Sequence, residues 1–239
     1  MDATLQRPAE PGHDTLLPLL WLASPTLPIG GFSYSEGLEA AVHAGLVHDE
    51  ASAAAWLCGQ LHLTQARADL SVIAAALPAW RESDWPRLQA LDTWVRQTRE
   101  TAELRLQSEQ MGRSLMEWLK SLQEPDALVY RLPDALRAPT YPVAYALALH
   151  TRLPAEAPVR SAVLAAAFAW AENLVQAAIK AVPLGQSAGQ RILARLCREI
   201  PAAVETALAT TDATRQSFTP LLAILSARHE TQYSRLFRS

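Results

Sequence analysis

Apolar residues recur every three to four positions along most of the 239-residue chain, a spacing that places them on one face of a helix. No stretch of six residues shows the apolar–polar alternation of a half-buried strand. We therefore predict an all-α fold, a globular helical bundle of roughly eight to ten helices around a shared core. The predicted helices cover residues 16–23, 50–66, 70–80, 100–122, 143–150, 159–182, 187–199, 202–209 and 220–228, with shorter ones behind Ser33 and behind Ser83 or Asp84.

Capping and turn residues set the expected ends of several helices. Ser33-Tyr34-Ser35-Glu36 has the spacing of a capping box, and Asp49 suits the N-cap of the helix that follows it. Gly45 fits the position just after a helix, where a left-handed backbone is common. Four prolines between Glu124 and Pro142 predict a loop or hinge.

The chain is expected to hold one all-α domain, residues 15–228, with a flexible segment at 1–14 and a partner-binding tail at 229–239. Half of its residues are hydrophobic and 19% are charged, which excludes a largely disordered chain. Residues 15–35 carry no charge, but prolines and glycines interrupt them repeatedly. A membrane-spanning helix with so many breaks would leave backbone groups unpaired in lipid, so we predict no membrane segment there.

Charge and cysteine content narrow the function classes. A net charge of -3 argues against nucleic-acid binding. Cys58 and Cys197 lie far apart without a CxxC partner, which favours a reducing, cytoplasmic compartment over a disulfide or zinc framework. The chain has neither an HExxH zinc motif nor a GxxxxGK[ST] phosphate loop. The alternative of an all-α small-molecule or cofactor-binding enzyme rests on Cys58 and His62, four apart on one apolar helix, where a core cysteine is the plainer interpretation.

Two internal segments hold candidate partner-binding residues. Residues 98–105 alternate in charge, which is typical of a solvated helix face, but Arg99, Glu100 and Glu103 can also face a partner. The break at residues 183–185 precedes Gln186, whose side chain either reaches a partner or caps a helix. The spacing of Gly185 and Gly189 favours close contact between two helices.

The last eleven residues differ from an ordinary polar chain end. They combine aromatic and arginine side chains, the residue types that anchor protein interfaces. Such a tail either orders when a partner binds or packs Tyr233 and Phe237 back on its own core. The candidate residues are His229, Glu230, Tyr233, Arg235, Leu236 and Phe237.

These segments together resemble a known family. Leu22 to Glu39, with Pro28-Ile29-Gly30-Gly31-Phe32-Ser33-Tyr34-Ser35-Glu36-Gly37-Leu38-Glu39 at its centre, resembles the N-terminal signature of the UreF family of urease accessory proteins. The charged run 99–105, the Pro183-Leu184-Gly185-Gln186 break and residues 227–239 look like the family's other marks, in the same order.

The resemblance implies a dimeric all-α protein with a non-catalytic role in the maturation of nickel urease. UreF-family proteins bind the accessory protein UreD or UreH, together recruit the GTPase UreG, and support nickel delivery to apo-urease. A role in regulating the GTPase is also implied. No intrinsic cofactor is expected, because the assembled complex handles the nickel; a nickel-binding metallochaperone with its own site is a further option.

The resemblance also assigns candidate residues to partners. Tyr233, Arg235, Leu236 and Phe237 are expected to anchor UreD/UreH, and Phe32, Ser33 and Tyr34 to lie on the same face or in the dimer interface. Arg99, Glu100 and Glu103 are candidates for the GTPase-facing surface. Deletion of residues 229–239 is expected to abolish co-purification with UreD/UreH and to leave the helical content intact.

Overall fold

The computed structural model describes residues 12–239, and within them the chain forms ten α-helices and no strand. The all-α prediction is therefore confirmed. Most of the predicted flexible segment, residues 1–11, lies outside the described residues, and His13 and Asp14 already belong to the first helix. The helices are α1 His13–Leu22, α2 Leu38–His43, α3 Glu50–Gln60, α4 Asp69–Glu82, α5 Trp85–Thr98, α6 Ala102–Ser121, α7 Tyr141–Arg152, α8 Val159–Ala181, α9 Gln186–Ala209 and α10 Pro220–Glu230.

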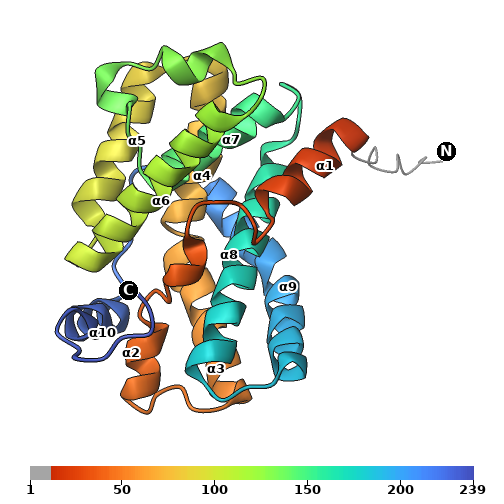
Figure 1. Ribbon diagram of the computed structural model, residues 1–239. Helices are drawn as coiled ribbons and strands as arrows, with labels where there is room; N and C mark the ends of the chain where they lie inside the picture. Colours follow the sequence, from red (N-terminus) through yellow and green to blue (C-terminus); the bar gives the residue numbers. More distant parts are fainter. Residues whose placement is uncertain (1–11) are drawn as a thin grey trace.

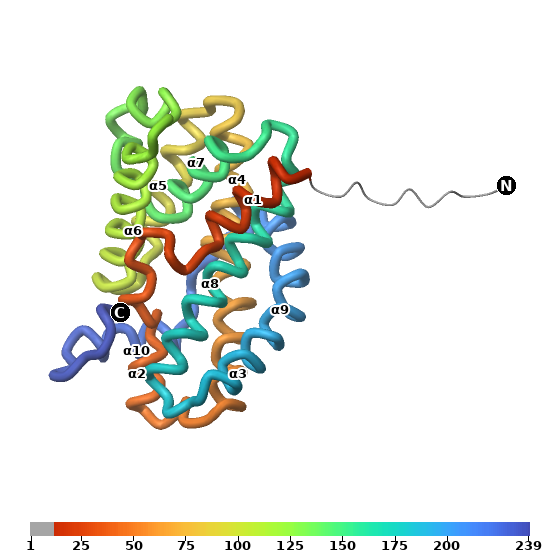
Figure 2. The backbone as a smooth tube through the Cα atoms, turned by 45° about the vertical axis from the view of Figure 1, so that its right-hand side comes forward, coloured from red at the N-terminus to blue at the C-terminus, as the bar shows by residue number. Residues whose placement is uncertain are grey.

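The helices pack around α4 and α7. Helix α4 contacts α5, α7, α8 and α9, and every residue of α7 from Pro142 to Leu149 is buried. Figure 1 shows α5, α6 and α7 at one end of the molecule and α2, α3 and α10 at the other, with α8 and α9 along one side. The tube in Figure 2 shows the C-terminus beside α6 and α2, while α1 lies at the opposite side of the molecule. One continuous core thus joins both ends.

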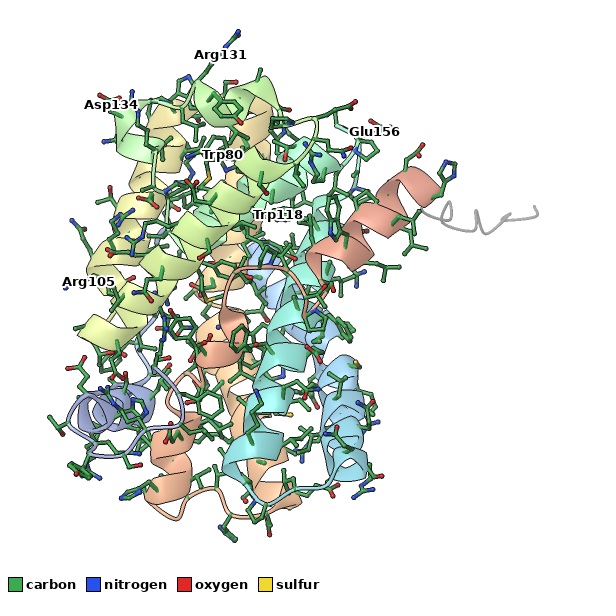
Figure 3. The ribbon with its side chains drawn as sticks, in the orientation of Figure 1. Trp80, Arg105, Trp118, Arg131, Asp134 and Glu156 are labelled. Carbon is green, nitrogen blue, oxygen red and sulfur yellow. The ribbon has the colours of Figure 1, made fainter. Side chains whose placement is uncertain are left out.

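Large aromatic side chains join the helices of this core. Trp80 of α4 is buried and donates its indole N–H to the Val143 carbonyl of α7 at 3.0 Å (Figure 3). Trp118 of α6 meets Trp21 of α1 edge to face, with ring centroids 5.1 Å apart. These contacts bury large apolar areas and satisfy the indole donor of Trp80.

Helix α9 corrects the prediction of two helices at 187–199 and 202–209. It runs unbroken through Pro201, which lacks the backbone N–H that would bond the Cys197 carbonyl. Both residues are exposed, so water can satisfy that carbonyl. The buried face continues past the proline through Ile200, Ala203 and Val204, and this packing keeps the helix intact.

Capping chemistry explains which predicted starts are correct. Asp49 caps α3 by accepting from the Ser52 amide at 2.8 Å, and Asp84, rather than Ser83, caps α5. The predicted helix 50–66 is α3 followed by a π-helical turn, Leu61–Gln65. Gly45 has the predicted left-handed backbone, with φ of 73°.

The capping box predicted at Ser33 is wrong. Gly31–Ser33 is a short 3-10 turn, and α2 begins only at Leu38. Left-handed backbone at Gly30 and Gly37, with φ of 73° and 76°, turns the chain before the helix can start. The hydroxyl of Ser35 instead accepts from the Glu39 amide at 3.2 Å.

Helix α8 is long and apolar enough to cross a membrane by length and composition alone, and it is the one such helix found within residues 12–239. Half of its most apolar stretch is buried inside the protein. It packs mainly against α9, α4 and α1, and also contacts α2, α3 and the turn Gly31–Ser33. A core helix of a folded domain has these same properties, so α8 is accounted for by packing.

Candidate functional site

The glycine turn, residues 30–37, contains two aromatic residues, one exposed and one buried. Phe32 is 66% exposed, whereas Tyr34 is buried and donates its hydroxyl to the Gln110 side chain of α6 at 2.6 Å. Ser33 lies between them, half-buried. The predicted trio therefore divides: Phe32 faces solvent, and Tyr34 holds the turn against α6.

The predicted tail begins within α10, which runs to Glu230. The segment after this helix, residues 231–239, is called the tail from here on, and it folds back onto the glycine turn. The Arg238 amide donates to the Ser33 carbonyl at 2.8 Å, and the Ser35 amide donates to the Ser239 carbonyl at 2.9 Å. The Ser239 hydroxyl donates to the Gln107 side chain of α6 at 2.7 Å. Phe237 is buried beneath this contact. Packing on the chain's own core is thus the alternative that the structure shows for Phe237, and its role as an anchor for UreD/UreH stays a prediction.

Glu39 of α2 holds the tail in place. Its carboxylate accepts from the backbone amides of Leu236 and Phe237, each at 2.8 Å. It also lies 3.2 Å from Nε2 of His229 and accepts from the Gln232 side chain at 3.3 Å. Hydrogen bonds to a carboxylate are stronger than those between neutral groups, so one side chain fixes four points of the chain end.

A second carboxylate, Glu103 at the start of α6, completes the arrangement. It lies 2.7 Å from Nδ1 of His229 and accepts from the Arg235 guanidinium at 2.6 Å. Glu230 returns the contact by accepting from the Glu103 amide at 3.1 Å. The sequence analysis singled out Glu103 in one segment and His229, Glu230 and Arg235 in another, and the fold brings them together. His229 is fully buried and Glu103 nearly so, so both side chains are engaged within the fold, and their partner-binding role stays a prediction.

The other predicted surface residues are dispersed. Arg99 is largely buried and pairs with Asp69 of α4, so it faces inward instead of presenting a solvated surface. Glu100 is exposed, and partial burial of its carboxyl group raises its pKa above the ordinary value. Gln186 lies exposed at the start of α9, where no side chain caps the helix. A Cβ at Gly189 would lie 2.4 Å from Cδ1 of Ile179, which confirms a close contact between α8 and α9 there, whereas a Cβ at Gly185 would meet no atom within 4 Å.

The outer side of the tail carries apolar side chains that are exposed to solvent. Tyr233 is fully exposed, Leu236 is 61% exposed, and Phe32 of the glycine turn is exposed as well. Further exposed apolar side chains near the end of the chain are Phe218, just before α10, and Leu221 and Ile224 on α10. An apolar surface of this kind, built on an ordered segment, is typical of a protein–protein contact.

Similarity to known proteins identifies the family of this chain. A model of the UreF family matches residues 47–197, more than half of the chain. The chain belongs to the UreF family. It is 60% identical to the urease accessory protein UreF of Methylibium petroleiphilum over 237 residues, which cover 98% of this chain and 99% of the relative. It is 62% identical to the UreF of Paracidovorax citrulli over 230 residues, or 94% of this chain and 89% of that protein.

A further relative carries the UreF part within a longer protein. The bifunctional urease accessory protein UreEF of Bordetella bronchiseptica is 48% identical over 228 residues, which cover 94% of this chain and 52% of the relative. The matches to UreF proteins extend over nearly the whole chain, so the family resemblance seen in the sequence is confirmed. UreF proteins are named as accessory proteins, not as enzymes.

A buried carboxylate of this UreF-family chain was not recognised as a site residue in the sequence. Glu36 has a left-handed backbone, with φ of 50°, and turns its side chain into a cavity of about 100 Å³ between the glycine turn, α4, α6 and α8. It accepts hydrogen bonds from Trp170 at 2.8 Å and from Gln107 at 2.9 Å. Burial raises its pKa above the ordinary 4.5, and the neighbouring Asp69 adds to the rise. One sequence feature could have pointed to Glu36: it is the first charged residue after the uncharged residues 15–35.

Replacing Glu36 with glutamine is expected to remove a pH-dependent destabilisation. Because the folded-state pKa is raised, the ionised carboxylate costs stability that sets in as pH rises above 4.5 and is complete above the folded-state pKa. The free energy of unfolding of the variant, relative to the wild type, should therefore increase with pH. Urea unfolding at a series of pH values from 4.5 upward measures this difference. A difference that is constant or falls with pH contradicts a raised pKa of Glu36. The loss of hydrogen bonds alone would change the free energy of unfolding by the same amount at low and at high pH.

The enzyme alternative gains no support from Cys58 and His62. Cys58 belongs to the core, and burial raises the pKa of its thiol, which makes the nucleophilic thiolate scarcer. His62 lies in the π-helical turn with its Nε2 atom 3.0 Å from Glu199. Neither residue lines the Glu36 cavity. Among residues 12–239, no three histidine, cysteine or acidic side chains cluster in a way that can hold a metal ion.

Proposed function

We propose that this UreF-family chain is a non-catalytic, cytoplasmic adaptor that acts as a homodimer in urease maturation. In this proposal it binds UreD/UreH, and the two together recruit the GTPase UreG and support nickel insertion into apo-urease. The adaptor has no cofactor of its own, and its contact with UreG regulates the GTPase. Neither nucleic acid nor a membrane takes part.

The observation that carries the proposal is the ordered tail with its apolar outer side. Glu39, Glu103 and the glycine turn hold the backbone of the tail. Tyr233 and Leu236, which the fold does not bury, remain in solvent. A partner that covers them meets a preorganised surface and loses little conformational entropy on binding. Glu100, an exposed candidate in another segment, stays available for a second partner.

The structure changes which variant tests the tail. Deletion of residues 229–239 removes the buried His229 and Phe237, so it would damage the fold as well as the surface. The double variant Tyr233→Ala/Leu236→Ala leaves the core untouched. We expect it to bind UreD/UreH at least about 30-fold more weakly, the effect of losing a central interface anchor, and to lower urease activation in cells.

Co-expression with tagged UreD/UreH, followed by affinity purification and a urease assay, measures both effects. The matched control is Tyr130→Ala/Leu63→Ala, which removes the same two side-chain types from exposed positions elsewhere. The control should bind and activate like the wild type. Undiminished binding by Tyr233→Ala/Leu236→Ala would overturn the assignment of the tail as the docking surface.

A further inference from the structure

An open pocket of about 230 Å³ lies where the glycine turn, α6 and the tail meet. Its lining includes Ser33 and Tyr34 from the turn, Gln110, Arg113 and Ser114 from α6, and Arg238 from the tail. The pocket therefore exists only while the tail is folded back. It is separate from the Glu36 cavity, which lies on the inner side of the glycine turn.

The two arginines of this pocket lack partners. Throughout residues 12–239, no carboxylate approaches within 4.0 Å of the guanidinium group of Arg113 or Arg238, whereas Arg96, Arg99 and Arg235 all form ion pairs. The acidic residues one helical turn from Arg113 are already engaged. Glu109 pairs with Arg96 at 3.0 Å, and Glu117 pairs with Lys120 at 2.9 Å. The pocket thus concentrates positive charge in a protein whose net charge is negative.

The backbone around both cations is held firmly. Arg113 stands on α6, and the Arg238 amide donates to the Ser33 carbonyl at 2.8 Å. The next residue, Ser239, is buried and hydrogen-bonded to Ser35 and Gln107. A ligand therefore meets two guanidinium groups on a preorganised backbone, which lowers the entropic cost of binding.

We propose that this pocket binds carboxylate side chains of an acidic segment in the protein partner that docks on the tail. The planar guanidinium group matches a carboxylate in two parallel hydrogen bonds, and the hydroxyl groups of Ser33 and Ser114 offer further donors. The same two segments also carry exposed apolar side chains, Phe32 just before Ser33 and Leu236 two residues before Arg238. Arginine beside aromatic and aliphatic groups is the composition of a protein interface, while a nucleic-acid site needs a broader basic stripe.

The inference rests on the proposed function, and the test uses the full-length chain with its UreD/UreH partner. The variant Arg113→Glu/Arg238→Glu reverses both charges in the pocket. The matched control, Arg131→Glu/Arg198→Glu, makes the same change in net charge at exposed arginines of the loop after α6 and of α9; Figure 3 shows Arg131 at the far end of the molecule from α10. Dissociation constants are measured at about 50 and 300 mM NaCl, because screening by salt weakens charge pairing.

We expect the pocket variant to bind at least about tenfold more weakly at low salt and to lose most of the salt dependence of the wild type. The control should bind within about twofold of the wild type. The neutral variant Arg113→Gln/Arg238→Gln should fall between them. All four arginines are exposed, so circular dichroism should show an unchanged fold.

The outcomes separate the inference from the function beneath it. If the wild type binds and the pocket variant binds equally well with the same salt dependence, the carboxylate site is refuted and the adaptor role stands. Equal weakening by the control would show a general charge effect and also refute the site. If the wild type does not bind UreD/UreH, the proposed function fails and the inference falls with it.

Discussion

Replacing Glu39 with alanine is expected to release residues 232–239 from the body of the protein and to abolish binding of UreD/UreH. The change removes the acceptor for the Leu236 and Phe237 amides and leaves the buried Nε2 atom of His229 facing an empty space. Polar groups that lose a charged partner are costly, most of all where they are buried, as His229 is. We expect the free energy of local opening to fall by about 3 kcal/mol, which accelerates amide exchange of the tail by about 100-fold.

Hydrogen exchange of the Leu236 and Phe237 amides measures this release directly. Glu39→Gln keeps one carbonyl oxygen as an acceptor, so its exchange should be intermediate. The matched control is Glu205→Ala, because Glu205 forms an exposed ion pair with Arg160 on the surface and such pairs contribute little. Continued protection of both amides in Glu39→Ala would show that Glu39 does not hold the tail.

The second large effect is expected at Gly112 in the middle of α6. A Cβ atom there would lie 2.1 Å from the Pro139 carbonyl oxygen and 3.0 Å from the Tyr141 nitrogen. These are backbone atoms of the segment that leads into α7, so they cannot turn aside as a flexible side chain would. Gly112→Ala must separate α6 from α7, and we expect the free energy of unfolding to fall by about 3 kcal/mol.

Differential scanning calorimetry should show a melting temperature lower by about 6 to 12 °C for a domain of this size. The control is Gly59→Ala in α3, where an added Cβ meets no atom within 4 Å. Because alanine favours a helix over glycine, this variant should gain about 0.5 to 1 kcal/mol. Equal stability of the two variants would contradict the close crossing of α6 and α7.

Local signals in the sequence were sufficient for much of the fold. The helical spacing of apolar residues predicts nearly all of the helices, since one buried stripe per helix is a local pattern. Asp49 and Gly45 mark helix ends because a cap needs only its own neighbours in the chain. The same reasoning failed at Pro201, where packing of Ile200 and Val204 outweighs one missing hydrogen bond.

The candidate site was predicted less completely. The sequence pointed to Glu103, His229 and Arg235 as special residues, and they do meet. It placed them on a surface, because a run of charged and aromatic residues does not show which side chains a distant helix will cover. Glu36 and Glu39 were missed as site residues for the same reason.

By itself, the sequence determined the all-α class, most helix boundaries and membership of the UreF family, because each depends on short-range spacing or on motifs that can be read in order. Only the tertiary structure decided that Phe237 is core while Tyr233 is exposed, and that Arg113 and Arg238 share a pocket. These outcomes depend on contacts between α2, α6 and the tail, such as the bond from the Leu236 amide to Glu39 across almost the whole chain. Residues so far apart have no local periodicity in common, and only the packing of the helices brings them together.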